Sequence, residues 1–396
     1  MATEKLSVEN FGPIQKADLD LRKVTVLIGE QASGKSVLAK LVALSRKQGF
    51  LIKNKKGKWW ENDLNYFALD GFYSEKSFFS YDNEDFNAVF QESKLTLSYN
   101  NLRLKNLSDR IRTLGNRQDT IEKDLNNAFE KENFEKASEL ETEKGQNSIE
   151  LVKLNNELKL SFLSSEYIPA ERVVVSFIRC HRFEDIYLND FINTFTERRS
   201  RKVKTKIFPF DVEYRYDDKN DDDYADKILI GGKDSEIQLY QAASGIQSLV
   251  PMEVIIETAN PRQKHIFIVE EPELNLFPTI QNKLVQYLIE KCTKGDNRLI
   301  ITTHSSYILT ALSNLIEAKN VVKQNPDLHE AVAQIIPPQY WLDFDDVSAY
   351  FVGGGTAYSI RDEENQNIDA NPIDAVSNET GRIFDQLLDL KYATTA

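Results

Sequence analysis

Residues 29–36 are Gly-Glu-Gln-Ala-Ser-Gly-Lys-Ser, which fits the phosphate-binding P-loop pattern G-x-x-x-x-G-K-[S/T] at every required position. The β-branched run at 24–28 predicts a buried strand before this loop, and the apolar spacing at 37–44 predicts a helix after it. Between them, two glycines let the backbone wrap closely around a phosphate chain. Loop N–H groups and the helix N-terminus supply positive potential. The stretch therefore predicts a nucleoside triphosphate site.

Individual loop residues have separate expected roles. Lys35 would reach the β- and γ-phosphates, and the Ser36 hydroxyl would bind Mg²⁺. The alternative, an ordinary glycine-rich turn, is disfavoured by the flanking strand and helix. ATP and Mg²⁺ are therefore the expected cofactors. The expected nucleotide contacts are Gly29, Glu30, Gln31, Ala32, Ser33, Gly34, Lys35 and Ser36.

Length and composition are those of a soluble globular protein. The 396 residues allow two or three domains, and 41% hydrophobic with 28% charged residues is ordinary usage. Neither a long apolar run nor a signal-peptide profile is present, so we expect a cytoplasmic protein without membrane contact. Cys180, Cys292 and four histidines fit a reducing cytosol and argue against structural zinc. The net charge of −13 disfavours an extended basic surface for nucleic acid.

Alternating patterns predict hairpins near both ends of the chain. Residues 6–21, with a Gly-Pro turn, predict a β-hairpin that leads into the P-loop strand. Residues 347–361 predict a second, late hairpin around three glycines. Residues 374–391 have the apolar spacing of an amphipathic helix. The Phe- and Tyr-rich stretch 45–100 gives no clear prediction.

Residues 101–160 are polar, charged and free of proline. Core-type positions follow a 4-3 spacing and then its mirror image, reflected about a point between Glu132 and Asn133. This symmetry predicts an antiparallel coiled-coil hairpin with Asn133 capping the second helix and arms of about 35–40 Å. Two ordinary packed helices, or a turn at 145–148 instead, are the alternatives. The two series are Leu107, Ile111, Leu114, Gln118, Ile121, Leu125 and Ala128, then Ala137, Leu140, Lys144, Asn147, Leu151, Leu154 and Leu158.

A P-loop enzyme also needs a metal-binding acid and a group that activates water. The apolar stretch 266–269 predicts a strand that ends in Glu270 and Glu271. Successive strand residues face opposite ways, so the two acids can take separate roles. Glu270 would hold Mg²⁺ through water, and Glu271 would orient or deprotonate the attacking water. Two acids at a strand end are by default merely solvated, but the P-loop upstream favours the catalytic interpretation.

Two further motifs complete the candidate site. A second apolar strand at 298–303 ends at His304, which could reach the γ-phosphate and sense its loss; a structural histidine is the alternative. Ser244 and Gly245 stand at a predicted helix start, where a hydroxyl and free N–H groups form an anion site. Ser-Gly also caps helices without any ligand.

One dense basic run, residues 198–206, is followed by acidic residues at 217–223. Such a run is most often a solvated loop whose charge is neutralised by the acids nearby. Contact with nucleic acid is the alternative.

Taken in order, four motifs resemble the ABC-type ATPase heads of SMC, RecF and OLD proteins. They are the P-loop, Ser-Gly-x-Gln at 244–247, Glu-Glu-Pro-Glu at 270–273 and the strand ending at His304. The resemblance implies an α/β fold, in which a mixed sheet flanked by helices is interrupted by a short antiparallel coiled-coil hairpin. The chain would divide into an N-terminal head part (1–100), the hairpin (101–160) and a C-terminal head part (161–396).

The sequence departs from this family in detail. Asn275 and Phe277 stand where the family often has histidines, and the signature at 244–247 is looser than Ser-Gly-Gly-Gln. No Q-loop glutamine is evident. The catalytic acids themselves match.

The resemblance also implies an assembly and partners. Ser244 and Gly245 would complete the nucleotide site of a second subunit, so that two ATP molecules lie in a head-to-tail dimer or a larger ring. ATP binding would close the dimer, and hydrolysis driven by Glu271 would open it. The size, the hairpin and the segment Tyr-Ile-Pro-Ala-Glu-Arg at 167–172 are most similar to the AriA subunits of PARIS anti-phage systems, with the PtuA subunits of Septu as rivals.

Such a subunit would hold a separate effector nuclease, Toprim-like or HNH-like, until a phage trigger protein releases it. A RecF-like DNA-binding repair ATPase is the alternative, with the basic run at 198–206 as its best support. An SMC-like tether is a third possibility, for which the hairpin is short.

Overall fold

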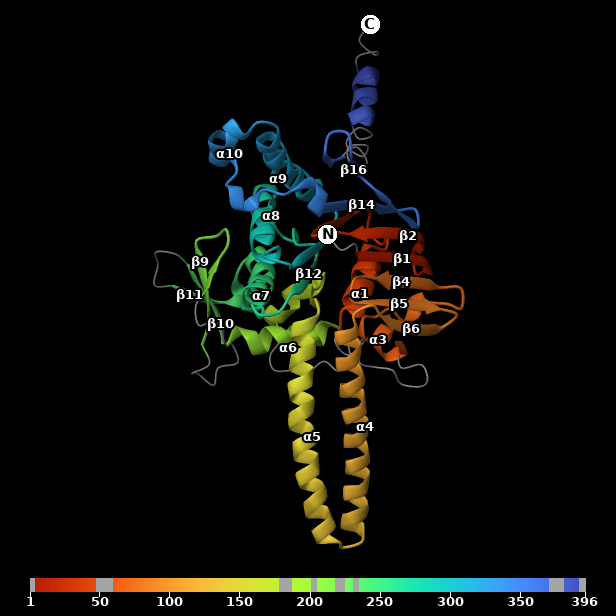
Figure 1. The fold of residues 1–396 in the computed structure, drawn as a ribbon. Coiled ribbons are helices and arrows are strands. Elements are labelled where there is room, and N and C mark those ends of the chain that lie inside the picture. The colour runs from red at the N-terminus through yellow and green to blue at the C-terminus, as the bar shows by residue number, and fades with distance from the viewer. Residues whose placement is uncertain are drawn as a thin grey trace.

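The computed structural model describes residues 4–47, 60–177, 187–200, 205–217, 225–230, 235–369 and 381–391. An α/β body carries a long helical hairpin that projects from one side (Figure 1). In the described ranges, no helix combines the length and apolarity that crossing a bilayer requires. The helices are α1 (Lys35–Ser45), α3 (Trp60–Tyr66), α4 (Leu102–Glu130), α5 (Phe134–Ser161), α6 (Tyr187–Arg199), α7 (Ser244–Thr258), α8 (Pro278–Cys292), α9 (Ser306–Gln324) and α10 (His329–Ile335), with 381–391 also helical.

Within the described residues, eleven strands form one mixed sheet in the order β6-β5-β4-β1-β2-β15-β14-β3-β13-β12-β7. The strands from β14 to β7 are parallel neighbours, whereas β1, β2, β4, β5 and β6 pair antiparallel. These strands are β1 (Glu4–Phe11), β2 (Ile14–Leu21), β3 (Val24–Ile28), β4 (Phe78–Asp82), β5 (Phe86–Gln91), β6 (Lys94–Tyr99), β7 (Ser164–Ile168), β12 (His265–Glu270), β13 (Arg298–Thr303), β14 (Val347–Gly353) and β15 (Thr356–Ser359).

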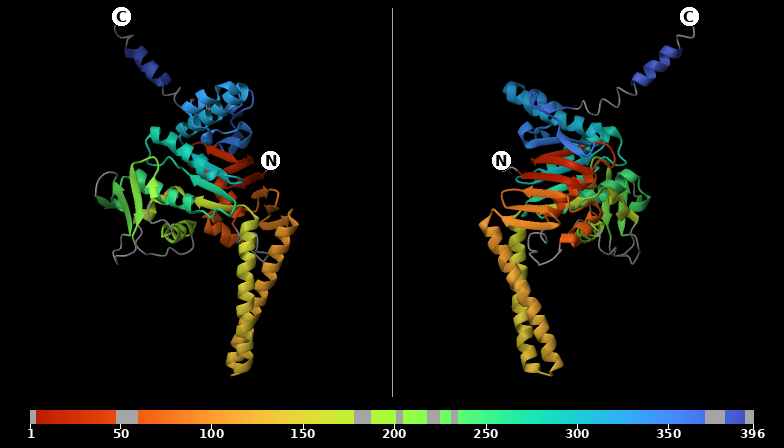
Figure 2. Two further views of the ribbon diagram at one scale, coloured as in Figure 1. Left: turned by 60° about the vertical axis from the view of Figure 1, so that its left-hand side comes forward. Right: turned by 90° about the vertical axis from the view of Figure 1, so that its right-hand side faces the viewer.

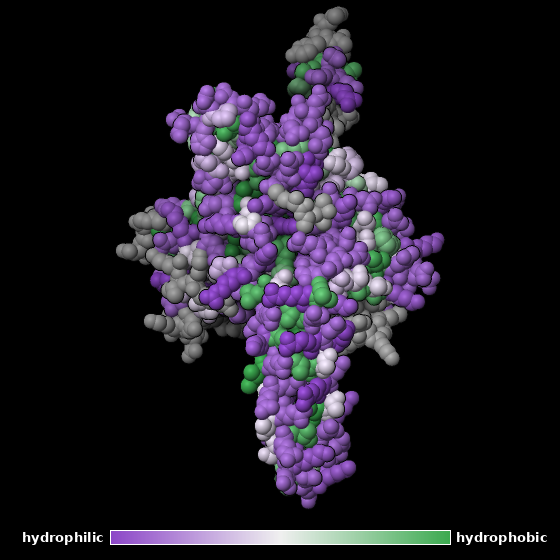
Figure 3. Space-filling view, in the orientation of Figure 1, coloured by the Kyte–Doolittle hydropathy of each residue, from purple (hydrophilic) through white to green (hydrophobic). Residues whose placement is uncertain are grey.

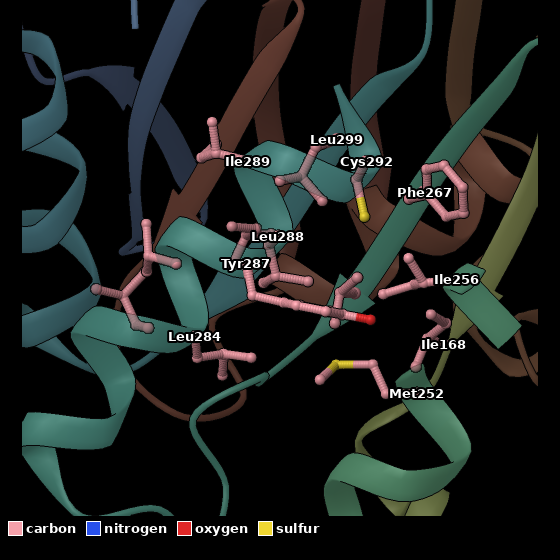
Figure 4. Packing of buried hydrophobic residues seen from close by; sticks show 14 of the residues in the cluster. Ile168, Met252, Ile256, Phe267, Leu284, Tyr287, Leu288, Ile289, Cys292 and Leu299 are labelled. Carbon is pink, nitrogen blue, oxygen red and sulfur yellow. The ribbon is translucent and has the colours of Figure 1, made fainter. Parts of the chain in front are cut away.

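The parallel half of the sheet is buried on both faces. All residues of β12 are buried, and alternate ones belong to different core clusters: Phe267 and Val269 to one, Ile266 and Ile268 to the other. Helices α7 and α8 contribute to the first cluster, while α1 contributes to the second. Full coverage explains why these strands are continuous apolar runs. Figure 4 shows part of the first cluster, to which Met252 and Ile256 of α7, Leu284 and Tyr287 of α8, Phe267 of β12 and Leu299 of β13 contribute side chains.

The predicted fold class is confirmed, including both β-hairpins. β1 and β2 pair antiparallel, as do β14 and β15. The stretch that gave no clear prediction holds α3 and the strands β4 to β6, which extend the sheet from β1. Of the predicted C-terminal helix, 381–391 is helical and exposed, and 374–380 lies outside the described residues. Smaller sheets are formed by β8 (Thr205–Ile207), β9 (Val212–Tyr216), β10 (Asp226–Ile230) and β11 (Glu236–Gln238), and by β16 (Arg361–Asp362) and β17 (Asn367–Ile368).

The antiparallel hairpin is formed by α4 and α5, which lie side by side in all views (Figures 1 and 2). Its turn falls at 131–133, and the Asn133 side chain accepts a hydrogen bond from Lys136 N at 3.1 Å, as predicted for the cap. The alternative turn at 145–148 is wrong, because those residues lie inside α5. Between the helices, the buried Asn147 side chain donates from Nδ2 to Oε1 of the partly buried Gln118 at 2.7 Å, which makes a polar layer of the kind that fixes register.

A buried ion-pair network joins the N-terminal strand to the rest of the sheet. The Glu4 carboxylate, 1% exposed, accepts from the Arg46 guanidinium at 3.0 Å and also pairs with Arg298. Arg46 in turn donates to the Tyr81 hydroxyl at 2.6 Å. One carboxylate on β1 therefore ties together the end of α1, β13 and β4.

Replacing Glu4 with glutamine is expected to destabilise the fold strongly, because the buried Arg46 guanidinium loses the nearer of its two carboxylates and the partly buried Arg298 loses its ion pair with Glu4. Breaking such a pair typically costs about 3–5 kcal/mol of unfolding free energy. Urea unfolding without nucleotide measures this. The matched control is Glu9→Gln, since Glu9 lies in an exposed 3.8 Å ion pair with Lys16 and should change the free energy by less than about 1 kcal/mol. Equal losses in the two variants would contradict the prediction.

Candidate nucleotide-binding site

The P-loop stands at the centre of the sheet, between the end of β3 and the start of α1, which confirms the predicted strand-loop-helix arrangement. Its two motif glycines are required sterically. A Cβ atom on Gly29 would lie 2.0 Å from the Val352 carbonyl oxygen. Gly34 has φ 106°, and a Cβ there would lie 2.4 Å from Ile14 Cδ1. Only glycine fits either position, because the backbone there passes too close to neighbouring atoms for a Cβ.

The Lys35 ammonium is folded into this loop. Lys35 is 4% exposed, and its Nζ donates to the carbonyl oxygens of Gly29 at 3.0 Å and Glu30 at 2.7 Å. Burial lowers the pKa of Lys35, while the carboxylates of Glu271 and Glu273 act in the opposite direction. A positive charge is thus held where the P-loop chemistry requires one.

Sheet topology brings the other predicted groups to the same edge. β12, β13 and β3 are parallel neighbours, so the residues that follow them, Glu271, His304 and the loop, lie together beyond the carboxyl ends of the strands. His304 Nδ1 lies 3.4 Å from Lys35 Nζ, and His304 Nε2 lies 3.1 Å from Glu271 Oε1. A neutral imidazole protonated on Nε2 satisfies both contacts, accepting from the lysine and donating to the carboxylate. The three side chains form one hydrogen-bonded chain.

Glu273, which the sequence reasoning did not single out, fixes the position of His304. Its Oε1 accepts from Thr303 Oγ1 at 2.6 Å and from the backbone N–H of His304 at 2.9 Å. The sequence did contain a signal for this residue, since Glu273 is the third acid of the Glu-Glu-Pro-Glu motif at 270–273. The carboxylate thereby ties the turn after β12 to the end of β13.

Glu270 is buried, in contrast to the partly exposed Glu271 beside it. Burial raises the pKa of Glu270 to about 7, and the Lys40 ammonium limits that rise, together with the nearby hydroxyls of Tyr167 and Ser36. Its Oε1 atom has no hydrogen-bond partner among the described residues. A buried carboxylate oxygen without a donor, close to the Ser36 hydroxyl, fits a bound cation.

The protein supplies few other metal ligands at this edge. In the described part of the chain, no group of three or more His, Cys, Asp or Glu side chains could hold a metal ion. Mg²⁺ is commonly bound by one or two protein groups together with substrate phosphates. Ser36 and Glu270 therefore fit a Mg²⁺ that arrives with a nucleotide.

A cavity of about 650 Å³ opens over the loop. Its polar wall includes Lys35, Glu271 and His304, and its apolar wall includes Pro13, Leu69 and Phe72. The Phe72 side chain is 43% exposed, and its ring packs against Gly12, where a Cβ would lie 3.0 Å from the ring. Sequence reasoning missed Leu69 and Phe72 because they lie in the stretch without a clear prediction. Charged and apolar walls together suit a phosphate chain with a flat base attached.

Ser244 and Gly245 do not line this cavity. The predicted helix start is confirmed: α7 begins at Ser244, which is exposed, while Gly245 is buried against Asn275. The Gln247 side chain turns inward and donates to Tyr240 O and Ala242 O, each at 2.8 Å. The role of Ser244 and Gly245 in the site of a second subunit stays a prediction.

Most of the basic run that the structure describes is paired with acids. Arg198 donates to Glu166 at 2.8 Å, Arg199 pairs with Asp226, and Lys206 lies 3.4 Å from Asp211. Residues 201–204 lie outside the described ranges. These ion pairs leave less positive charge available for nucleic acid than the sequence indicates.

Residues 182–309 match the family model described as AAA ATPase domain. The match includes β12, the two acids Glu270 and Glu271 at its end, and His304. It supports ATPase activity in general. Among solved structures, the chain is similar to the Smc head domain with an extended coiled coil bound to the C-terminal domain of ScpA, from Pyrococcus furiosus. That pair shares 10% identity over 96% of this chain and 100% of the other, with a TM-score of 0.40.

Two further structures are similar. The SMC head domain from Thermotoga maritima has 13% identity over 91% of this chain and 98% of the other, with a TM-score of 0.38. The recombination mediator protein RecF-ATPrS of the RecFOR pathway has 12% identity over 91% of this chain and 98% of the other, with a TM-score of 0.37. A search of curated proteins gave no match.

Proposed function

We propose that this chain is a Mg²⁺-dependent ATPase that hydrolyses ATP to ADP and phosphate. The observation that carries the proposal is the hydrogen-bonded chain from Lys35 through His304 to Glu271, at the mouth of a P-loop cavity. Lys35 and the loop N–H groups bind the phosphates. Glu271 orients the attacking water and accepts its proton. His304 lies between the two and senses whether a γ-phosphate is present.

Ser36 and Glu270 would hold the Mg²⁺. When bound, the ion neutralises charge on the phosphates. The supporting observation is the buried Glu270 oxygen that lacks a donor among the described residues.

Hydrolysis should therefore require a divalent cation. We expect phosphate release with Mg²⁺ and none with excess chelator. In Glu270→Gln, half-maximal activity should need about 10–100-fold more Mg²⁺, the range typical for loss of an indirect metal contact. Glu9→Gln, which removes the charge of an exposed glutamate paired with Lys16, is the control. An unchanged Mg²⁺ requirement in Glu270→Gln would remove this residue from the metal site.

The proposed working form is a head-to-tail dimer, or a ring built from it, in which Ser244 and Gly245 complete the partner's site. Support comes from the exposure of Ser244 at the start of α7, away from its own cavity. ATP binding then closes the dimer and hydrolysis opens it.

The proposed output of this switch is the holding and release of an effector nuclease, Toprim-like or HNH-like, in an anti-phage defence complex triggered by a phage protein. Motif resemblance supports this role. The hairpin offers a surface for a protein partner, since Figure 3 shows hydrophobic side chains along it. Its large exposed apolar residues are Leu102, Phe129, Phe134, Ile149, Val152 and Leu160.

Affinity purification of tagged Glu271→Gln protein with ATP, from its native host, tests the output. A stoichiometric nuclease without DNA supports the effector switch. Bound DNA without a protein partner would replace it with a RecF-like repair ATPase. In that case residues 198–206 become the next target for substitution.

A further inference from the structure

Arg172 lies at the back of the candidate site, in the 3-10 segment Ala170–Phe177 that follows β7. Its side chain is 0% exposed. Every nitrogen of the guanidinium donates to backbone carbonyl oxygens rather than to a carboxylate. The acceptors are Ser248 O (3.2 Å, from Nε), Pro169 O and Glu270 O (3.2 and 2.8 Å, from Nη1), and Glu271 O and Pro272 O (2.9 and 3.3 Å, from Nη2).

Placing a guanidinium in this position is energetically expensive. Burial lowers the pKa of Arg172 to about 10, and the charges of Glu273, Glu271 and Glu270 oppose that effect. A buried cation is tolerated only where its donors are satisfied. Three of the five acceptors belong to consecutive residues, 270–272, so most of these hydrogen bonds converge on one turn of the backbone.

That turn sets the direction of Glu271. Glu271 has φ 41°, a left-handed conformation that a glutamate rarely adopts and that surrounding contacts must maintain. Its N–H donates to Thr302 O at 2.8 Å on one side, and its carbonyl accepts from Arg172 on the other. The carboxylate thereby reaches His304 Nε2 at 3.1 Å.

Of the two other hydrogen bonds, one stays local at Pro169 O and the other leads to Ser248 O in α7. Ser248 lies about one helical turn after Ser244. Gly245 packs so closely on the turn after β12 that a Cβ would lie 3.0 Å from Asn275 O. One side chain therefore connects the start of α7 to the backbone of Glu271.

We propose that Arg172 is a positioning residue that holds Glu271 in its left-handed conformation and transmits movements of α7 to it. The inference rests on the proposed ATPase function. Ser244, at the start of α7, is proposed to contact the nucleotide bound by the partner subunit. Arg172 therefore links that contact to Glu271, so that hydrolysis in a subunit's own site depends on whether its α7 engages the partner's nucleotide.

Arg172→Lys and Arg172→Met test the first half of the proposal. Lysine keeps the charge but cannot reach both Ser248 O and the 270–272 carbonyls. Neither substitution touches the P-loop, so the Kd and KM for ATP should stay within about twofold. We expect kcat to fall about 100-fold, as for a small misplacement of a catalytic group. The control is Arg46→Lys, which changes another buried arginine and should lower stability while kcat of the folded protein stays within about twofold.

A folded Arg172 variant with wild-type kcat, or one whose kcat falls no more than that of Arg46→Lys, would overturn the proposal. Lys35→Ala separates this from failure of the ATPase assignment. If Lys35→Ala is inactive while the Arg172 variants are active, only the positioning role fails. If Lys35→Ala hydrolyses ATP normally, the proposed function fails first.

Hydrogen exchange tests the link without altering Arg172. In Glu271→Gln protein, ATP should protect the amides of 244–250 and those of 270–276 together, at the same nucleotide concentration. Protection of one stretch alone would show that α7 and the turn move independently, which would overturn the coupling even if neither Arg172 variant folds.

Discussion

Replacing Lys35 with alanine is expected to abolish ATP binding and hydrolysis. The Lys35 ammonium is buried in the loop and held by the carbonyls of Gly29 and Glu30, so its loss removes the charge that meets the phosphates. A hydrogen bond to a charged group contributes about 1.5–3 kcal/mol, which is roughly 10–150-fold in Kd for one such contact. Lys35 would contact two phosphates, so the expected loss lies at or beyond the upper end of this range.

Equilibrium titration with ATP measures this loss directly. Lys47→Ala is the matched control, because Lys47 follows the opposite end of the same helix, where it pairs with Asp190 at 3.3 Å. The control should bind ATP with wild-type affinity. If Lys35→Ala also binds ATP normally, the nucleotide occupies another site and the proposed ATPase mechanism has no basis.

Local patterns explain why part of this fold could be predicted from the sequence. The P-loop, the apolar β12 run and the mirrored spacing of α4 and α5 each contain their signal within a few turns or strands. β4 and β5 do not, although Phe79, Tyr81 and Phe90 are buried in alternation with more exposed neighbours. Because Phe78 and Phe79 are adjacent and both aromatic, the sequence does not show which of the two points into the core. Only the pairing of β4 with β1 decides which face is buried.

The candidate site divides in the same way. Glu271 and His304 could be predicted because each ends an apolar strand, and the parallel order of those strands brings them together. Arg172 carries no such signal, since its partners are backbone carbonyls that any sequence provides. Phe72 lines the cavity only because of the way its segment packs in the folded protein, which no local sequence pattern indicates. The groups that support the chemistry are therefore less visible in sequence than those expected to perform it.

Glutamine at position 271 is expected to stop hydrolysis while leaving ATP binding intact. The amide keeps the size of the carboxylate, and its oxygen can still accept from His304 Nε2, which now lies 3.1 Å from Glu271 Oε1. It cannot accept a proton from water. General-base catalysis contributes typically about 10²–10⁴-fold, so turnover should fall by that factor. ATP should then persist in the site and the closed dimer should accumulate.

Two measurements separate the two parts of this prediction. Phosphate release reports the base, and light scattering of the eluting protein with and without ATP reports the assembly. Glu9→Gln, a surface change of the same kind, should behave as wild type in both. Wild-type turnover in Glu271→Gln would mean that another group activates water. Slow turnover without a larger ATP-bound species would keep Glu271 as the base but reject the dimer switch, and Ser244 would then have no partner site to complete.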